Sequence, residues 1–186
     1  MSDPGVPTAD FAFAQEFCLR CDYANRGYVV EDSIGHAVAL LPRWLGGEVR
    51  TRTERWDVQT ERARHSWAII ARSVADGAEV GGVAQRLLPN IYRLWIVPGT
   101  TYHLIQNPLS DSWAVRDRHL RLARLSGLGT FATGGFDPRD PRALVGSIKT
   151  FDGPINSAPI ALTILLALEM VKAQALIPRS SAPGTY

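Results

Sequence analysis

Cysteine and histidine are scarce in this chain, and their placement argues against a metal site. The only two cysteines, Cys18 and Cys21, form one CxxC pair, whereas a structural zinc site needs four ligands. The residues around the pair lack the strand-then-helix pattern of a thioredoxin-like motif. The four histidines lie apart, without metal-ligand spacing, at His36, His65, His103 and His119. We predict no metal, no cofactor and two unremarkable thiols whose role the sequence leaves open.

Lysine is as scarce as cysteine, so the basic residues are 18 arginines and two lysines. A net charge of +2 is too small for a protein that binds a genome, and no nucleic-acid partner is expected. Residues 1–8 are polar and contain no basic region followed by an apolar core, which a secretion signal would have. The expected location is the cytoplasm, either free or at the periphery of a membrane.

Catalytic motifs are missing as well. The chain contains no GxSxG elbow of a Ser-His-Asp hydrolase, and the sequence GLG at residues 127–129 lacks the third glycine of a dinucleotide-binding loop. Asp137 and Asp140 could form a carboxylate pair, but the sequence DPRDP is more typical of two Asp-Pro turns. The histidines are expected to be surface or hydrogen-bonded residues. Catalytic residues therefore stay unknown.

One stretch is both long and apolar, residues 157–177, and it predicts a helix. Asn156 and Ser157 are good N-cap residues, and Pro159 suits the first turn, where its missing N–H group costs nothing. Pro178 cannot continue the helix. This is the element around which we expect the remaining chain to be organised.

The apolar helix has no polar face, because only Thr163 interrupts the run from residue 160 to 168. Such a helix must be enclosed by protein or by lipid. A membrane span needs about 20 apolar residues, whereas Glu169 and Lys172 interrupt this stretch earlier. We favour a buried core helix over a membrane span, and expect these two charges to pair where the helix emerges into water. Leu165 and Leu168 are expected in the core.

Between residues 27 and 151 apolar and polar residues alternate with period two, which is typical of half-buried strands. Turn residues separate ten such segments: 28–31, 36–41, 55–59, 66–74, 79–86, 92–97, 101–106, 113–117, 120–125 and 143–151. Short strands at this spacing favour an antiparallel barrel or sandwich. Before them, the spacing of Phe13 and Phe17 after Asp10 predicts a short amphipathic helix over residues 10–22. The Gly/Pro-rich segment 127–141 is expected to be a surface loop that carries function.

Three tryptophans recur in related phrases, as SWAI from residue 66, SWAV from residue 112, and the shorter WDV from residue 56. In a strand each tryptophan and the residue two positions later face the same side. We expect Trp56, Trp67 and Trp113 to be core residues that fill the ends of a barrel. An ancient duplication that made two similar halves is the alternative.

Several motifs follow one another in an order that resembles a known family. They are a D-x-x-G turn at residues 32–35 (DSIG), a W-x-V strand at 56–58 (WDV), a W-x-V-x-D strand at 113–117 (WAVRD) and the final apolar helix. In this order the chain resembles the tubby-like superfamily, in particular its LURP-one-related and phospholipid scramblase group, over residues 27–177. The chain lacks the acidic calcium ligands and the cysteine runs of the scramblases.

The resemblance implies an α+β fold that is mainly antiparallel β, with a closed β-barrel around a buried hydrophobic C-terminal helix. A short N-terminal helix would precede the barrel. The expected organisation is a disordered lead over residues 1–9, one domain over 10–178 and a flexible tail over 179–186. Within the domain, the helix covers 10–22, the barrel 27–151 and the core helix 157–177.

Arginine is the one residue type that gathers in a suggestive way. Two sets stand at alternate or nearly alternate positions, where side chains can share a face of a strand and bind phosphate or carboxylate groups. The first set is Arg50, Arg52 and Arg55, and the second is Arg116, Arg118 and Arg121, followed by Arg124. A solvated outer face neutralised by neighbouring acids is the alternative interpretation.

Three functions are compatible with these features. The first is a lipid-binding or small-ligand-binding module, either free or at the periphery of a membrane, whose arginines contact anionic lipid. The second is a cofactor-independent cyclase or isomerase of secondary metabolism that binds an apolar small molecule at the barrel surface or mouth. The third is a structural partner protein. The sequence leaves the ligand and the oligomeric state undetermined.

Overall fold

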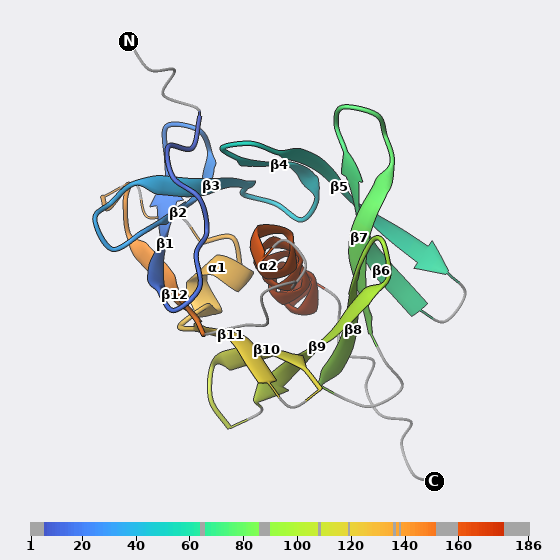
Figure 1. The fold of residues 1–186 in the computed structure, drawn as a ribbon. Coiled ribbons are helices and arrows are strands. Elements are labelled where there is room, and N and C mark those ends of the chain that lie inside the picture. Colours follow the sequence, from blue (N-terminus) through green and yellow to red (C-terminus); the bar gives the residue numbers. More distant parts are fainter. Residues whose placement is uncertain are drawn as a thin grey trace, which may run out of the picture.

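Twelve antiparallel strands form a closed barrel within the part of the chain that the computed structural model describes, namely residues 6–63, 66–85, 90–107, 109–118, 120–135, 137, 139–151 and 160–176 (Figure 1). The strands in chain order are β1 (Glu16–Asp22), β2 (Gly27–Glu31), β3 (Ala37–Pro42), β4 (Gly47–Thr51), β5 (Arg55–Ala63), β6 (Ser66–Ser73), β7 (Glu79–Gln85), β8 (Ile91–Ile96), β9 (Thr100–Asn107), β10 (Ser112–Asp117), β11 (Leu120–Ser126) and β12 (Leu144–Thr150). Each strand pairs with its neighbours in the sequence, and β1 closes the ring against β12. The predicted closed antiparallel barrel is therefore confirmed.

The period-two pattern located the ten predicted strands well, because alternating side chains face the core. In β8, Tyr92, Leu94 and Ile96 are buried, whereas Arg93 between them is exposed. The largest difference in length is at β5, which runs on to Ala63.

The predicted helix over residues 10–22 is wrong, because its second half is strand β1. Phe17, Leu19 and Cys21 are buried inside the barrel, while the alternate residues face outward. The same apolar residues can be read with helical or with strand spacing over so short a stretch. Pairing with β12 and β2 on its two sides, which closes the barrel, decides in favour of the strand.

Strand β4 was not predicted at all. Only Val49 and Thr51 of its five residues are buried, and Gly46 before it and Gly47 at its start both have positive φ angles. Two glycines followed by charged residues resemble a loop in a sequence. In the structure, β4 pairs with β5 and brings Glu48 opposite Asp57 and Arg50 opposite Arg55.

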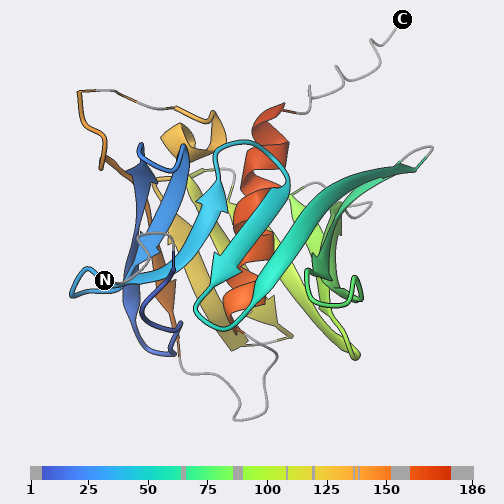
Figure 2. The same ribbon diagram turned by 90° about the horizontal axis from the view of Figure 1, so that it is seen from above.

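Helix α2 (Ile160–Leu176) lies inside the ring of strands, as Figures 1 and 2 show from two directions. Its residues from Leu162 to Ala173 are buried on every side, with Leu165 2% and Leu168 0% exposed. This burial explains why the sequence has no polar helical face. The proposed capping residues Asn156 and Ser157, like Pro159 and Pro178, lie outside the described residues. Among the described helices none is long and apolar enough to cross a membrane.

The tryptophans are not equally buried. Trp56 and Trp113 are 4% exposed and belong to the core, and the Trp113 ring lies 5.6 Å from that of Tyr92. Trp67 is only partly buried and packs against the edge of the core.

The segment predicted as a long surface loop contains the short helix α1 (Gly129–Ala132), which lies against α2 (Figure 2). Phe131 of this helix is fully buried, and its ring lies 4.7 Å from the ring of Tyr28. Gly129 N–H donates a hydrogen bond to Asp111 Oδ2, and Arg43 Nε donates one to the carbonyl oxygen of Gly134. The segment therefore covers one end of the barrel.

Candidate functional site

The first arginine set is neutralised by acidic neighbours. Glu48 Oε1 lies 2.5 Å from Arg50 Nε and 2.8 Å from Arg55 Nη2, and Arg52 pairs with Asp10 at 3.5 Å. Burial raises the pKa of Glu48, but the hydrogen bonds from Arg55 and Arg50 outweigh it, and the net result is a lowered pKa. The carboxylate stays ionised beside its two guanidinium groups. Two carboxylates thus offset two of the three positive charges of this set.

The second arginine set belongs to a row of basic side chains that crosses four strands on the outside of the barrel. Arg116 on β10 stands opposite His103 on β9 and Arg121 on β11, and His103 stands opposite Arg93 on β8. Val115, the residue before Arg116 in β10, faces the core and is buried. Arg116 and the other basic residues of the row therefore face outward. Among the described residues no carboxylate forms an ion pair with Arg116 or Arg121.

A groove lies beside this row, with a volume of about 420 Å³. Its polar lining consists of Arg116, Arg121, Arg124, Gln106, Asn107 and Ser112. Its apolar lining consists of Ile105, Trp113 and Ala114. We call this feature the arginine groove. Arg118, which the sequence placed with this set, lies in the turn after β10 and does not line the groove.

The arginine groove is electrostatically unfavourable without a ligand. Like charges directly opposite on neighbouring strands repel each other, and here Arg116 faces Arg121. Within the described residues, Arg116 Nε is buried and has no hydrogen-bond acceptor. The Arg121 guanidinium carbon lies 5.8 Å from the centre of the Phe151 ring, which neutralises no charge. An anion with several oxygen acceptors would satisfy these donors and reduce the repulsion.

Glu169 and Lys172 form an ion pair that is completely enclosed. Lys172 Nζ also donates hydrogen bonds to the carbonyl oxygens of Pro42 at 2.9 Å and Trp44 at 3.1 Å. Glu169 Oε2 accepts one from Gly46 N–H at 3.1 Å. The two charges were predicted to pair where the helix emerges into water, but the loop between β3 and β4 covers them. Burial raises the pKa of Glu169, and Lys172 opposes that shift.

The other reactive groups near this barrel end are held in their neutral forms. Burial, followed by Cys21, raises the pKa of Tyr28 to about 12. Burial and then Asp140 raise the pKa of the Cys21 thiol, which makes it a poor nucleophile at neutral pH. Among the described residues no three His, Cys, Asp or Glu side chains form a group that could hold a metal ion.

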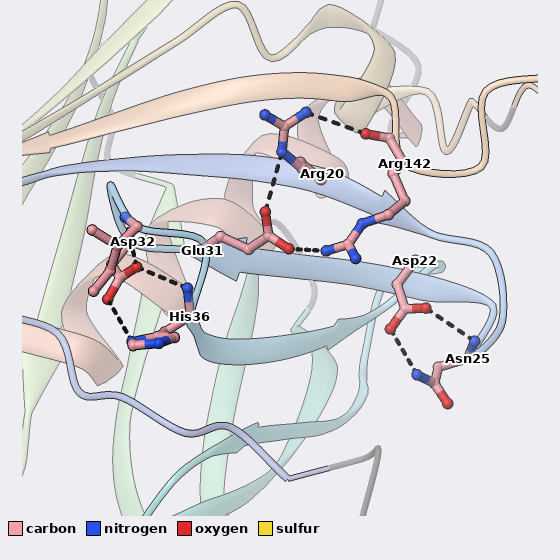
Figure 3. Close-up of polar contacts among 8 residues, drawn as sticks. Arg20, Asp22, Asn25, Glu31, Asp32, His36 and Arg142 are labelled. Carbon is pink, nitrogen blue, oxygen red and sulfur yellow. Dashed lines mark hydrogen bonds and ion pairs between the residues drawn. The ribbon is translucent and has the colours of Figure 1, made fainter.

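The remaining candidates have structural explanations. Asp140 N–H bonds to the Asp137 carbonyl oxygen, in keeping with a turn. Asp32 Oδ1 accepts hydrogen bonds from Ile34 and His36 N–H and so closes the turn between β2 and β3 (Figure 3). His65 and His119 lie outside the described residues.

The sequence identified Arg116, Arg121 and Arg124 but missed Arg93 and His103 as members of the same row. Each occupies an outward-facing position of a predicted strand, so the alternation could have found them. Their alignment depends on the pairing register of β8 to β11. Comparisons with known proteins found no family model, curated protein or solved structure that matches this chain.

Proposed function

We propose that this protein is a tubby-like barrel that binds anionic lipid through the arginine groove and acts at the periphery of a membrane. The observation that carries the proposal is a row of guanidinium groups that, among the described residues, has no carboxylate partner. The closed barrel of twelve strands with an enclosed hydrophobic helix supports the tubby-like assignment. So does the order of the DSIG turn, the two tryptophan strands and the apolar helix.

Lipid fits the composition of the groove. Guanidinium groups bind phosphate and carboxylate oxygens in pairs of parallel hydrogen bonds. Basic residues near an anionic surface each contribute about 1 kcal/mol. Ile105 and Ala114 form an apolar wall next to the arginines, which suits the boundary between a headgroup and an acyl chain.

The interior of the barrel does not favour the alternative function, a cyclase or isomerase that binds an apolar small molecule. The two crevices that the described residues form against α2 each have a volume of about 10 Å³, which is at most enough for one water molecule. These two crevices are too small for an apolar substrate, and we place lipid binding first.

Co-sedimentation with vesicles tests the proposal. We expect the protein to pellet with vesicles that contain phosphatidylserine and to remain in the supernatant with vesicles of phosphatidylcholine alone. Raising the salt concentration from 50 mM to 500 mM should release it, because the attraction is screened. Equal recovery with both vesicles at low salt would remove lipid binding through the groove.

A further inference from the structure

A second polar site lies on a different wall of the barrel, around Glu31 at the end of β2 (Figure 3). Val30 before it faces the core, so Glu31 faces outward, yet its side chain is only 8% exposed. Arg20 Nε on the adjacent strand β1 lies 3.1 Å from Glu31 Oε2. Arg142 Nη2 pairs with the other oxygen, Oε1. A carboxylate that has been removed from water is thus held by two guanidinium groups.

A pocket of about 390 Å³ adjoins this carboxylate. Its walls include the apolar side chains of Val29, Ala37 and Leu40, and its rim includes Asp22 and Tyr23. Asp22 accepts hydrogen bonds from Asn25, and within the described residues it has no basic partner. The pocket thus combines an apolar wall, one exposed aromatic ring, two carboxylates and Arg142 itself.

The two arginines that hold Glu31 are not equivalent. Arg20 stands on a strand, its side chain is 35% exposed, and its Nη1 also donates to the Arg142 carbonyl oxygen. Arg142 precedes β12 on the segment that covers the barrel end, and its side chain is 68% exposed. Water can therefore hydrate the Arg142 guanidinium group when that group moves away from Glu31. Glu31 is buried, so the loss of one of its two cations is costly unless another cation replaces it.

We propose that Glu31 and its pocket bind a guanidinium or ammonium group on an apolar stem, as in a basic side chain of a partner peptide. Arg142 occupies the site as an internal ligand until the partner displaces it. The stem would lie along Val29 and Leu40, and Asp22 at the rim would attract the approaching charge. This proposal is independent of lipid binding, because Glu31 and the arginine groove lie on different strands.

The test is an NMR titration of the ¹⁵N-labelled protein with N-acetyl-arginine amide, which carries one guanidinium group and no other charge. N-acetyl-citrulline amide is the matched control, because it has nearly the same shape without the charge. We compare the wild-type protein with R142A, with R142A/E31Q and with R139A, which removes an exposed arginine from the same segment. Thermal melting establishes that each variant is folded.

An internal ligand weakens the apparent affinity for an external ligand, because the external ligand can bind only during the fraction of time in which the site is free. We expect R142A to bind the arginine amide about tenfold more tightly than the wild type and R139A, with shifts at Val29, Ala37 and Leu40. R142A/E31Q should lose this gain, and the citrulline amide should not bind. Equal affinities of folded R142A and the wild type would overturn the proposal, as would equal binding of citrulline. If R142A does not fold, the same comparison with R142Q decides the matter.

Discussion

Lys172 Nζ lies 2.5 Å from Glu169 Oε1 inside the barrel, and the two side chains are 2% and 0% exposed. The pair joins the core helix to the end of β3 and to the loop that follows it. Lys172 donates hydrogen bonds to the carbonyl oxygens of Pro42 and Trp44, and Glu169 accepts one from Gly46 N–H. The Lys172 ammonium group also lies 5.5 Å from the centre of the Phe131 ring of α1. The loop, α1 and α2 therefore meet at one enclosed ion pair.

Removing one partner of this pair should be strongly destabilising. K172M leaves the Glu169 carboxyl group without its cation in a site that excludes water. Removing one partner of a buried ion pair costs about 3–5 kcal/mol of stability. Urea denaturation of the wild type and K172M measures the loss in the free energy of unfolding.

The double variant E169L/K172M provides the control, because it removes both charges together. Its loss should be smaller than the sum of the losses of E169L and K172M, with a coupling energy of about 2 kcal/mol. Additive losses would show that the two charges do not stabilise each other.

Tyr28 should make the stability depend on pH in the alkaline range. Its pKa is raised from 10 to about 12, so the folded state retains the phenolic proton longer than the unfolded state. This contribution is complete below pH 10 and is lost as the pH rises to 12. Between these values the free energy of unfolding of the wild type should fall by about 2 kcal/mol more than that of Y28F. Parallel curves for the two proteins would contradict the assignment.

The core position of α2 predicts unequal effects of two leucine truncations. Leu168 is fully buried, and L168A should lower the free energy of unfolding by about 2–5 kcal/mol. Leu144 on the outer face of β12 is 57% exposed, and L144A should change it by less than about 0.5 kcal/mol. Similar losses for the two variants would mean that α2 is not enclosed in solution.

Alternation allowed ten of the twelve strands to be predicted from the sequence, and the apolar run allowed the final helix to be predicted. Alternation alone left a barrel and a sandwich open, and the closed barrel was expected from the family resemblance. In β1 the alternation of Phe17, Leu19 and Cys21 was present, but Phe13 gave the same segment a helical spacing. In β4 only two residues face the core, which is too few for a pattern. Both strands depend on neighbours for their conformation, and a local pattern cannot represent those neighbours.

The candidate site was only partly predictable for the same reason. Arg50 and Arg55 are spaced as Arg116 and Arg121 are, and the local difference is Glu48, which lies two residues before Arg50 on the same face of β4. The difference arises from β4, which brings Glu48 to Arg50 and Arg55. Net charge and spacing identify candidate arginines, but strand register determines which of them are neutralised.

The two arginine sets therefore offer a matched comparison for the central claim, which is that the arginine groove binds anionic lipid. R116A/R121A/R124A and R50A/R52A/R55A each remove three positive charges from exposed strands or turns of one barrel. At about 1 kcal/mol for each arginine near the surface, the first triple variant should lose about 3 kcal/mol of binding to phosphatidylserine vesicles.

The most direct measurement is the partition coefficient of the wild type and both triple variants with these vesicles at low salt. We expect R50A/R52A/R55A to stay within about threefold of the wild type and R116A/R121A/R124A to bind about a hundredfold more weakly. Equal losses for the two folded variants would mean that only overall charge matters, and would contradict a binding site in the arginine groove.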